Sequence, residues 1–424
     1  MRNIVILCDG TGNEISQNIS NVLKLYRCLR KTEKTQPRQL VFYDPGVGTL
    51  ERPDPWHRLR QNFNAILGLA TGYGLDDNVL AAYAFLVANY QDGDQIYLFG
   101  FSRGAYTVRV LAGLIHKVGL IAPQQVNLAG SGLIAYKQFS SDVAPQFHGN
   151  MRATDAGDED GPLAASPFDN AAQFARITSS RWPTIKFVGV WDTVASVIVP
   201  RPDRLYWPSL EELAFTLQNP SVHIFRQAIS IDERRCMFRL KKWDDPQTFA
   251  HNRFNDAHSE PQDIKQVWFA GVHADIGGGY PEKQSGLSKY PLLWMIDEAV
   301  QCGLAVNPRT VNQLAWGVQR KGSPFSYVAP DVSGDLHDSL TGAWWILEFL
   351  PKSAKYREWP ARKVHFGFYI PDGEPRLIPE GASVHESVVK RMDMLAGYRP
   401  VNLPARFESV PMPTPPEPAS HEGV

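Results

Sequence analysis

The pentapeptide at residues 100–104, Gly-Phe-Ser-Arg-Gly, is the feature of this chain that most narrows its fold. It follows residues 95–99, a short apolar and aromatic run typical of a buried strand, and it precedes residues 105–115, whose apolar side chains recur at helical spacing. A strand, a tight turn and a helix in this order form the nucleophile elbow of α/β-hydrolases. Glycines suit this turn because side chains there would collide with the strand or the helix. Ser102 is therefore predicted to be a nucleophile, and the alternative is an ordinary strand-to-helix turn with a capping serine.

A serine hydroxyl needs a general base within hydrogen-bond reach and an acid that orients this base. In α/β-hydrolases the acid and then the histidine follow the serine, each at the end of a later strand. Asp192 directly follows a predicted strand at 184–191, so it is the candidate acid, unless it caps a helix. His273 lies just past a predicted strand at 264–272 and opens a glycine-rich loop, so it is the candidate base. His385, at the start of a predicted helix, is the alternative base, a supporting group or a capping residue.

Acyl transfer also needs hydrogen-bond donors that face the developing oxyanion. The backbone N–H of Arg103, the residue after the serine, is the first predicted donor. A glycine-bearing turn after the first strand, Gly10-Thr11, is predicted to supply the second. An aspartyl phosphatase also begins with an apolar strand and Asp-x-Asp-Gly-Thr. Here Leu7 stands two residues before Asp9, where that pattern needs its nucleophilic aspartate, so phosphatase chemistry is disfavoured.

Strand and helix patterns alternate along the first part of the chain. Residues 2–8 and 39–43 are apolar runs typical of buried strands, and residues 21–30 and 76–90 carry apolar residues at helical spacing. Such alternation favours a parallel sheet covered by helices on both faces. The sequence therefore predicts the α/β class, with an α/β-hydrolase-like, mostly parallel central sheet and a helical, aromatic C-terminal region.

Composition along the chain suggests how it is divided. We expect a catalytic core over residues 1–290, interrupted at about 140–170 by a polar, acidic and flexible surface insertion. Residues 291–400 are expected to form a helical extension that packs on or caps the core. Residues 401–424, rich in proline and glutamate, are expected to be a disordered tail.

Charge and cysteine usage exclude several classes of partner and cofactor. A formal net charge of -1 over 424 residues offers no basic footprint for nucleic acid. The four cysteines are scattered, so we expect neither a metal site nor a disulfide framework, and no cofactor. The apolar start at residues 4–8 is too short for a cleaved leader, and no apolar run is long enough to span a membrane. The chain is expected to be cytoplasmic as made, and export would need a secretion system that reads no leader.

Six motifs occur in order along the chain: residues 9–13, 43–49, 100–106, 191–194, 232–235 and 271–280. Together they resemble the catalytic domain of type VI secretion phospholipase effectors of the first lipase class. The resemblance is strong over residues 1–290 and extends as far as 395 through residues 384–388. It implies an α/β-hydrolase fold and attack on the acyl esters of glycerophospholipids, with Ser102, Asp192 and His273 in the triad positions. For a secreted effector, it also implies an immunity protein as a partner.

The predicted substrate is a lipid ester, and the side chains around the predicted turns and the aromatic C-terminal region are its expected contacts. These residues are Asp9, Gly46, Val47, Asp275, Trp344 and Trp345. The aromatic cluster at 344–350 either lines an acyl pocket, touches a membrane interface peripherally, or simply packs in the core. The predicted function is a serine hydrolase of carboxylic esters, a lipase or phospholipase. The alternatives are a non-catalytic binding relative and a soluble small-ester hydrolase with no membrane role.

Overall fold

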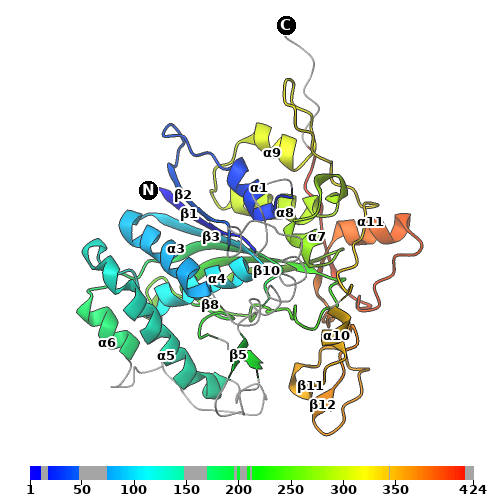
Figure 1. Ribbon diagram of the computed structural model, residues 1–424. Coiled ribbons are helices and arrows are strands. Elements are labelled where there is room, and N and C mark those ends of the chain that lie inside the picture. Colours follow the sequence, from blue (N-terminus) through cyan, green and yellow to red (C-terminus); the bar gives the residue numbers. More distant parts are fainter. Residues whose placement is uncertain are drawn as a thin grey trace, which may run out of the picture.

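One eight-stranded sheet forms the centre of the structure, and all its neighbouring strands are parallel (Figure 1). The computed structural model describes residues 1–10, 18–46, 74–147, 170–194, 198–200, 208–210, 213–342 and 344–415. The strand order is β14-β13-β10-β7-β4-β3-β1-β2. The strands are β1 (Asn3–Cys8), β2 (Gln39–Asp44), β3 (Gln95–Phe101), β4 (Ile185–Trp191), β7 (Val222–Ser230), β10 (Asp263–Phe269), β13 (Ser383–His385) and β14 (Glu408–Val410).

Helices cover both faces of this sheet. The described helices are α1 (Asn21–Cys28), α3 (Leu75–Asn89), α4 (Arg103–Lys117), α5 (Ala129–Phe147), α6 (Asn170–Ile177), α7 (His273–Gly277), α8 (Lys289–Gln301), α9 (Pro308–Leu314), α10 (Trp344–Glu348) and α11 (Glu386–Met394). Apolar residues of α3, α4 and α5 pack in one core, whereas those of α1, α8 and α9 pack in another. The predicted α/β class is thereby confirmed, and the architecture is consistent with an α/β-hydrolase-like fold.

The sequence of β1 explains why it is buried on both sides. Ile4 and Ile6 belong to the core beneath α3 and α4, while Val5 and Leu7 belong to the core beneath α1 and α8. Successive side chains of a strand point to opposite faces, so a strand between two helical layers must be apolar at every position. The continuous apolar run is therefore the signature of a central strand of a covered parallel sheet.

The end of the chain completes the sheet. β13 pairs with β10 and β14 pairs with β13, although β13 lies in the expected extension and β14 in the expected disordered tail. Trp268 on β10, Val384 on β13 and Val388 on α11 belong to a third apolar cluster that holds this part of the chain against the core. The prediction of a disordered tail over 401–424 therefore fails for residues 408–410, because their backbone is hydrogen-bonded in the sheet.

Three short antiparallel pairs lie outside the main sheet. They are β5 (Ile198–Pro200) with β6 (Pro208–Leu210), β8 (Thr248–Phe249) with β9 (Glu260–Pro261), and β11 (Lys352–Ser353) with β12 (Phe368–Tyr369). In Figure 1, β11, β12 and α10 form an orange projection beside the main body. Most of the insertion expected at 140–170 lies outside the described residues. Among the helices that are described, none combines the length and apolarity needed to cross a membrane.

The parallel arrangement brings the carboxyl ends of the strands to one edge. Ser102 follows β3, Asp192 follows the neighbouring β4, and His273 follows β10, with β7 between. Ligand sites of open α/β sheets lie outside this edge. The three residues singled out from the sequence therefore emerge on the same side of the molecule.

Candidate active site

Ser102 occupies a strained turn between β3 and α4. Its backbone has φ 56° and ψ −121°, a conformation that residues with a Cβ rarely adopt. A Cβ at Gly100 would lie 2.4 Å from the carbonyl oxygen of Gly104, and a Cβ at Gly104 would lie 2.1 Å from the carbonyl oxygen of Cys8. Both glycines are therefore required by the close approach of α4 to β3 and β1, as expected for an elbow of this sequence.

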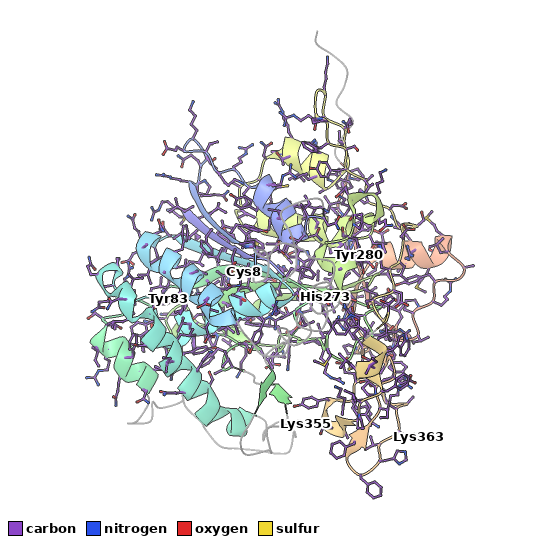
Figure 2. The ribbon with its side chains drawn as sticks, viewed as in Figure 1. Cys8, Tyr83, His273, Tyr280, Lys355 and Lys363 are labelled. Carbon is purple, nitrogen blue, oxygen red and sulfur yellow. The ribbon has the colours of Figure 1, made fainter. Side chains whose placement is uncertain are left out.

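A chain of two hydrogen bonds joins the side chains of Ser102, His273 and Asp192. The Ser102 Oγ lies 2.8 Å from Nε2 of His273, and the Nδ1 of the same ring lies 2.5 Å from Oδ2 of Asp192. All three side chains are buried, and Figure 2 places His273 near the middle of the molecule. An imidazole held through Nδ1–H by a carboxylate presents an unprotonated Nε2 to the hydroxyl. Chemically, this arrangement can draw the proton from the serine as its oxygen attacks an acyl carbon.

Asp192 is held in its charged form by a cation that the sequence analysis did not identify. Arg376 Nη1 lies 2.6 Å from Oδ1 of Asp192, and Arg376 Nη2 lies 3.1 Å from Oδ2. The backbone N–H of Ser230 also donates to Oδ1, at 3.0 Å. Burial by itself would raise the pKa of this carboxyl, but Arg376 and His273 outweigh burial and hold the pKa well below its ordinary value. The surroundings of Asp192 therefore favour the ionised carboxylate that faces the imidazole.

The surroundings of His273 favour its neutral form. Burial lowers the pKa of its imidazole below the ordinary 6.5, and the opposing effect of Asp192 does not restore it. Two aromatic rings flank it, with centroids 4.7 Å away for Phe101 and 4.8 Å away for Phe238. An imidazole shielded in this way keeps the unprotonated Nε2 that a general base requires.

Glu233 fixes the backbone at the histidine. Its Oε2 accepts the backbone N–H of His273 at 3.1 Å, and the Arg235 guanidinium lies 2.8 Å from the same oxygen. Burial opposes ionisation of this carboxyl, but Arg235 lowers its pKa to about 2. Both residues lie in the motif at 232–235. Opposite charges two residues apart are compatible with a local ion pair, but only the folded chain places this pair beside His273.

The predicted oxyanion donors are only partly described. Arg103 is the first residue of α4, so its backbone N–H lies in the first turn of that helix, at the positive end of the helix dipole. The Gly10 N–H instead donates to Oδ1 of its neighbour Asp9 at 2.7 Å, which directs this N–H away from an oxyanion role. Thr11, the other predicted donor of this turn, lies outside the described residues. The N–H of Gly10 is therefore engaged within its own turn, and the structure does not support Gly10 as an oxyanion donor.

Asp9 organises the turn after β1. Its Oδ2 accepts hydrogen bonds from the hydroxyls of Ser20 and of Tyr43, the latter at 2.8 Å. Gly46, with φ 79°, packs on this turn so closely that a Cβ would lie 2.9 Å from the carbonyl oxygens of Asp9 and Gly10. The segment after β2 that contains Gly46 thus packs on the turn after β1 that contains Asp9. Substrate contact by either residue stays a prediction. Val47, predicted beside them, lies outside the described residues.

Asp275 was predicted to contact substrate and lies in the first turn of α7, two residues after His273. One of its oxygens accepts the backbone N–H of Val272 at 3.0 Å, and the other lies 2.7 Å from Nδ1 of His337. The His337 ring in turn stacks on Tyr280, with centroids 3.5 Å apart. Both carboxylate oxygens therefore have partners within the protein, and they position the glycine-rich loop after the histidine.

The two predicted tryptophans differ in their surroundings. The Trp344 ring lies 5.4 Å from the ring of Phe238, which itself flanks His273, so a single aromatic side chain separates it from the imidazole. Trp345 is 41% exposed and stacks against Phe349. Trp344 thus lies one ring away from the imidazole and Trp345 is exposed, and substrate contact by either tryptophan stays a prediction.

His385, the alternative base, lies at the end of β13 and is fully buried. Its Nδ1 bonds to the hydroxyl of Ser387 at 2.8 Å and caps α11, and its ring stacks on Phe269. Burial lowers its pKa to about 3. His273, not His385, carries the hydrogen bond to Ser102, and His385 has the surroundings of a capping residue.

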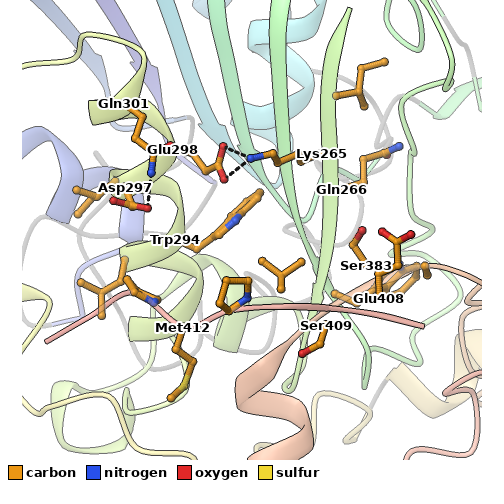
Figure 3. A pocket seen from close by; sticks show the side chains of 18 of the residues that line it. Lys265, Gln266, Trp294, Asp297, Glu298, Gln301, Ser383, Glu408, Ser409 and Met412 are labelled. Carbon is orange, nitrogen blue, oxygen red and sulfur yellow. Dashed lines mark hydrogen bonds and ion pairs between the residues drawn. The ribbon is translucent and has the colours of Figure 1, made fainter. Parts of the chain in front are cut away.

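A cleft described by the structure lies away from these residues. Within the described parts of the chain, no group of three or more histidine, cysteine, aspartate or glutamate side chains is arranged to hold a metal ion. A cleft of about 1010 Å³ lies between β10, α8 and the β13–β14 edge (Figure 3). The Lys265–Glu298 ion pair, 2.8 Å long, lies on its wall, and neither Ser102, Asp192 nor His273 lines it. This cleft is therefore distinct from the site at the carboxyl edge of the sheet.

Comparisons with known proteins identify the family. A family model described as the catalytic domain of Tle1-like phospholipase effectors of the type VI secretion system (T6SS) matches residues 2–298. The uncharacterized protein YEL023C of Saccharomyces cerevisiae is 23% identical over 580 aligned positions, which cover 95% of this chain and 80% of that protein. A crystal structure of an uncharacterized protein from Pseudomonas aeruginosa is 18% identical, with a TM-score of 0.35, over 73% of this chain and 47% of that one. The chain thus spans about half the length of that solved protein.

Proposed function

The chain belongs to the family of Tle1-like phospholipase catalytic domains, and from this premise we propose that it is a serine hydrolase that cleaves acyl esters of glycerophospholipids. The observation that carries the proposal is the hydrogen-bonded chain from Ser102 through His273 to Asp192, at the end of a strained turn. The family supports phospholipid as the substrate class.

In the proposed reaction, His273 Nε2 takes the proton of Ser102 while Oγ attacks the acyl carbonyl carbon. The carbonyl oxygen becomes an oxyanion, which the backbone N–H groups of Arg103 and Thr11 are proposed to hold. The imidazolium then gives its proton to the leaving alkoxide, and the lysolipid departs from the acyl-enzyme. Water, activated by the same imidazole, releases the fatty acid and restores the serine.

The other buried charges serve this cycle by holding the imidazole. Asp192 keeps the Nδ1 proton in place and stabilises the imidazolium that forms during each step. Arg376, in this proposal, is a positioning residue: it fixes the Asp192 carboxylate and does not touch the substrate. Glu233 holds the backbone of His273 through the N–H that it accepts.

Hydrolysis assays with a Ser102→Ala variant test the proposal. We expect the variant to lose about three or more orders of magnitude in kcat/KM on phospholipid vesicles and on short p-nitrophenyl esters. Its melting temperature should stay within a few degrees, because the substitution removes a single small side-chain atom. Activity of the wild-type protein on the short esters alone would favour the soluble small-ester hydrolase. Retention of activity by the variant would refute the serine mechanism.

A further inference from the structure

Residues 344–370, called the aromatic lobe below, project from the sheet and carry a concentration of exposed apolar side chains. The lobe consists of α10, β11, β12 and their connections, and Figure 1 shows it as the orange part beside the main body. Its exposed large apolar residues are Trp345, Ile346, Phe349, Leu350, Val364, Phe366, Phe368 and Ile370. Single exposed apolar residues are ordinary on a protein surface, but a concentration in one short segment marks a binding surface.

The tip of the lobe presents an aromatic side chain where local structure does not favour one. His365 and Phe368 pair across a two-residue turn, in which Phe366 has φ 49° and Gly367 has φ 79°. Positive φ at both central residues defines a type I′ turn, for which Asn-Gly is the preferred sequence. Phe366 is also fully exposed. Neither turn chemistry nor packing within the chain explains a phenylalanine here, so its side chain is suited to a partner outside the chain.

Basic side chains surround this apolar surface. Lys355, Arg357 and Lys363 are exposed on the lobe, and Figure 2 shows both lysines there. The acidic groups of the lobe and of the segment that follows it are engaged within the protein. Glu348 is buried and accepts backbone N–H groups, Glu358 and Glu374 pair with Arg239, and Asp372 pairs with Arg362. The exposed charge of the lobe is therefore positive, which is complementary to an anionic surface.

The base of the lobe adjoins the candidate active site. Trp344, its first residue, contacts Phe238, which flanks His273. Just beyond the lobe, Arg376 bonds to Asp192. A surface bound by the lobe would consequently lie beside the end of the sheet at which Ser102 emerges.

We propose that the aromatic lobe docks the protein on the surface of a membrane rich in anionic phospholipids, with its apolar side chains in the headgroup region and its lysines and arginine on the lipid phosphates. Apolar insertion combined with basic residues is the combination by which peripheral proteins bind such membranes. The inference rests on the proposed function, since it brings the site to its lipid substrate. It deepens that function by naming where the membrane binds.

The test measures co-sedimentation with vesicles, using Ser102→Ala as the parent so that the lipid stays intact. We expect the parent to bind phosphatidylglycerol-containing vesicles at least about tenfold more tightly than pure phosphatidylcholine vesicles. Phe366→Asp keeps a residue tolerated at positive φ, and Ile346→Asp changes α10, where Ile346 is 67% exposed. Each should weaken binding to the anionic vesicles about tenfold or more. The matched control is Ile177→Asp, at a residue 77% exposed on α6, which should bind as the parent does.

The outcomes separate this inference from the proposed function. Equal binding by the Phe366→Asp, Ile346→Asp and Ile177→Asp variants, or no vesicle binding by the parent, would overturn the lobe as a membrane surface. A self-associated parent that becomes monomeric with Phe366→Asp, without vesicle binding, would assign the lobe to a second copy of the chain and also overturn it. Phe366→Asp with Ser102 intact should leave hydrolysis of short p-nitrophenyl esters unchanged. Absence of ester hydrolysis by the wild-type protein, together with vesicle binding by the parent, would instead count against the serine hydrolase and leave the lobe as a membrane surface.

Discussion

Replacing Arg376 by methionine removes the cation paired with Asp192 while keeping a side chain of similar length. The guanidinium also donates to the carbonyl oxygens of Ser230 and Phe238, so four hydrogen bonds are lost in a fully buried position. Removing one partner of a buried ion pair costs about 3–5 kcal/mol of folding free energy. For a chain of 424 residues, about 1 kcal/mol corresponds to roughly 1 °C in melting temperature, so a fall of about 3–6 °C is expected.

The more specific effect of Arg376→Met is on the pH dependence of activity. Arg376 Nη2 lies 3.1 Å from Oδ2 of Asp192, the same oxygen that Nδ1 of His273 contacts at 2.5 Å, so the guanidinium and a protonated imidazole repel each other across one carboxylate. Without Arg376 this repulsion is lost, the carboxylate stabilises the imidazolium more strongly, and the pKa of His273 rises. His273 must be neutral to accept the serine proton, so activity is lost as pH falls below its pKa. The wild-type acid limb should lie below pH 6.5, because burial lowers this pKa, and the limb of the variant should move to higher pH.

The assay is kcat/KM on a short p-nitrophenyl ester between pH 4 and 9, alongside thermal unfolding. The matched control is Arg226→Met: Arg226 is a buried arginine on β7 whose partners are Glu298 and Asp263, at 2.6 and 2.7 Å. It should lower stability comparably and leave the acid limb in place. Arg376→Lys should lie between the wild type and Arg376→Met, because it keeps the charge and loses the two-pronged geometry. An acid limb that coincides in the Arg376→Met and Arg226→Met variants would refute the positioning role.

Three further predictions follow from local geometry. Gly104→Ala should lower the free energy of unfolding, measured in urea, by more than about 4 kcal/mol, because the added Cβ would overlap the carbonyl of Cys8. The control is Gly130→Ala on α5, whose added Cβ meets no atom within 4 Å and which should stabilise the fold by about 1 kcal/mol. Equal effects of the two substitutions would contradict the close packing of the elbow. His385→Asn keeps a residue that caps helices well, so this variant should preserve ester hydrolysis. His273→Asn should instead lower kcat/KM by about three orders of magnitude. A comparable loss in His385→Asn would identify His385 as the base. Burial lowers the pKa of His116 and His385 to about 3, so unfolding exposes groups that protonate below about pH 6.5, and urea stability should fall as the pH drops from there toward 3. A stability that is constant over this range would contradict the neutral state of both rings.

The local part of the fold was predictable because adjacent residues specify it. The apolar strand before Ser102, the glycines around it and the helical spacing after it lie within about twenty residues of chain. The α/β class is confirmed by the parallel sheet, and the family membership by the family model that matches residues 2–298. β7 was not foreseen, because Arg226 and Gln227 interrupt its apolar run, and each is accommodated only by partners distant in sequence. β13 and β14 are three residues each, too short for a periodic pattern.

The surroundings of the site show the same limit. Asp192 and His273 could be proposed because each directly follows a strand, and the roles of both stay predictions. Arg376 could not, because 184 residues separate it from Asp192 and no local pattern marks it. Gly10 was proposed as an oxyanion donor from its position after β1. The sequence did not reveal that the neighbouring Asp9 carboxylate accepts its N–H. Long-range pairing of buried charges is a property of the folded chain, which a local pattern does not encode.

Covalent labelling by a fluorophosphonate, read by mass spectrometry of the digested protein, tests most directly whether Ser102 is an activated nucleophile. The native wild-type protein should carry one adduct, on the peptide containing Ser102, and labelling should slow strongly in His273→Asn and vanish in Ser102→Ala. A native protein that takes up no probe, or an adduct that persists after Ser102 is replaced, would contradict the account.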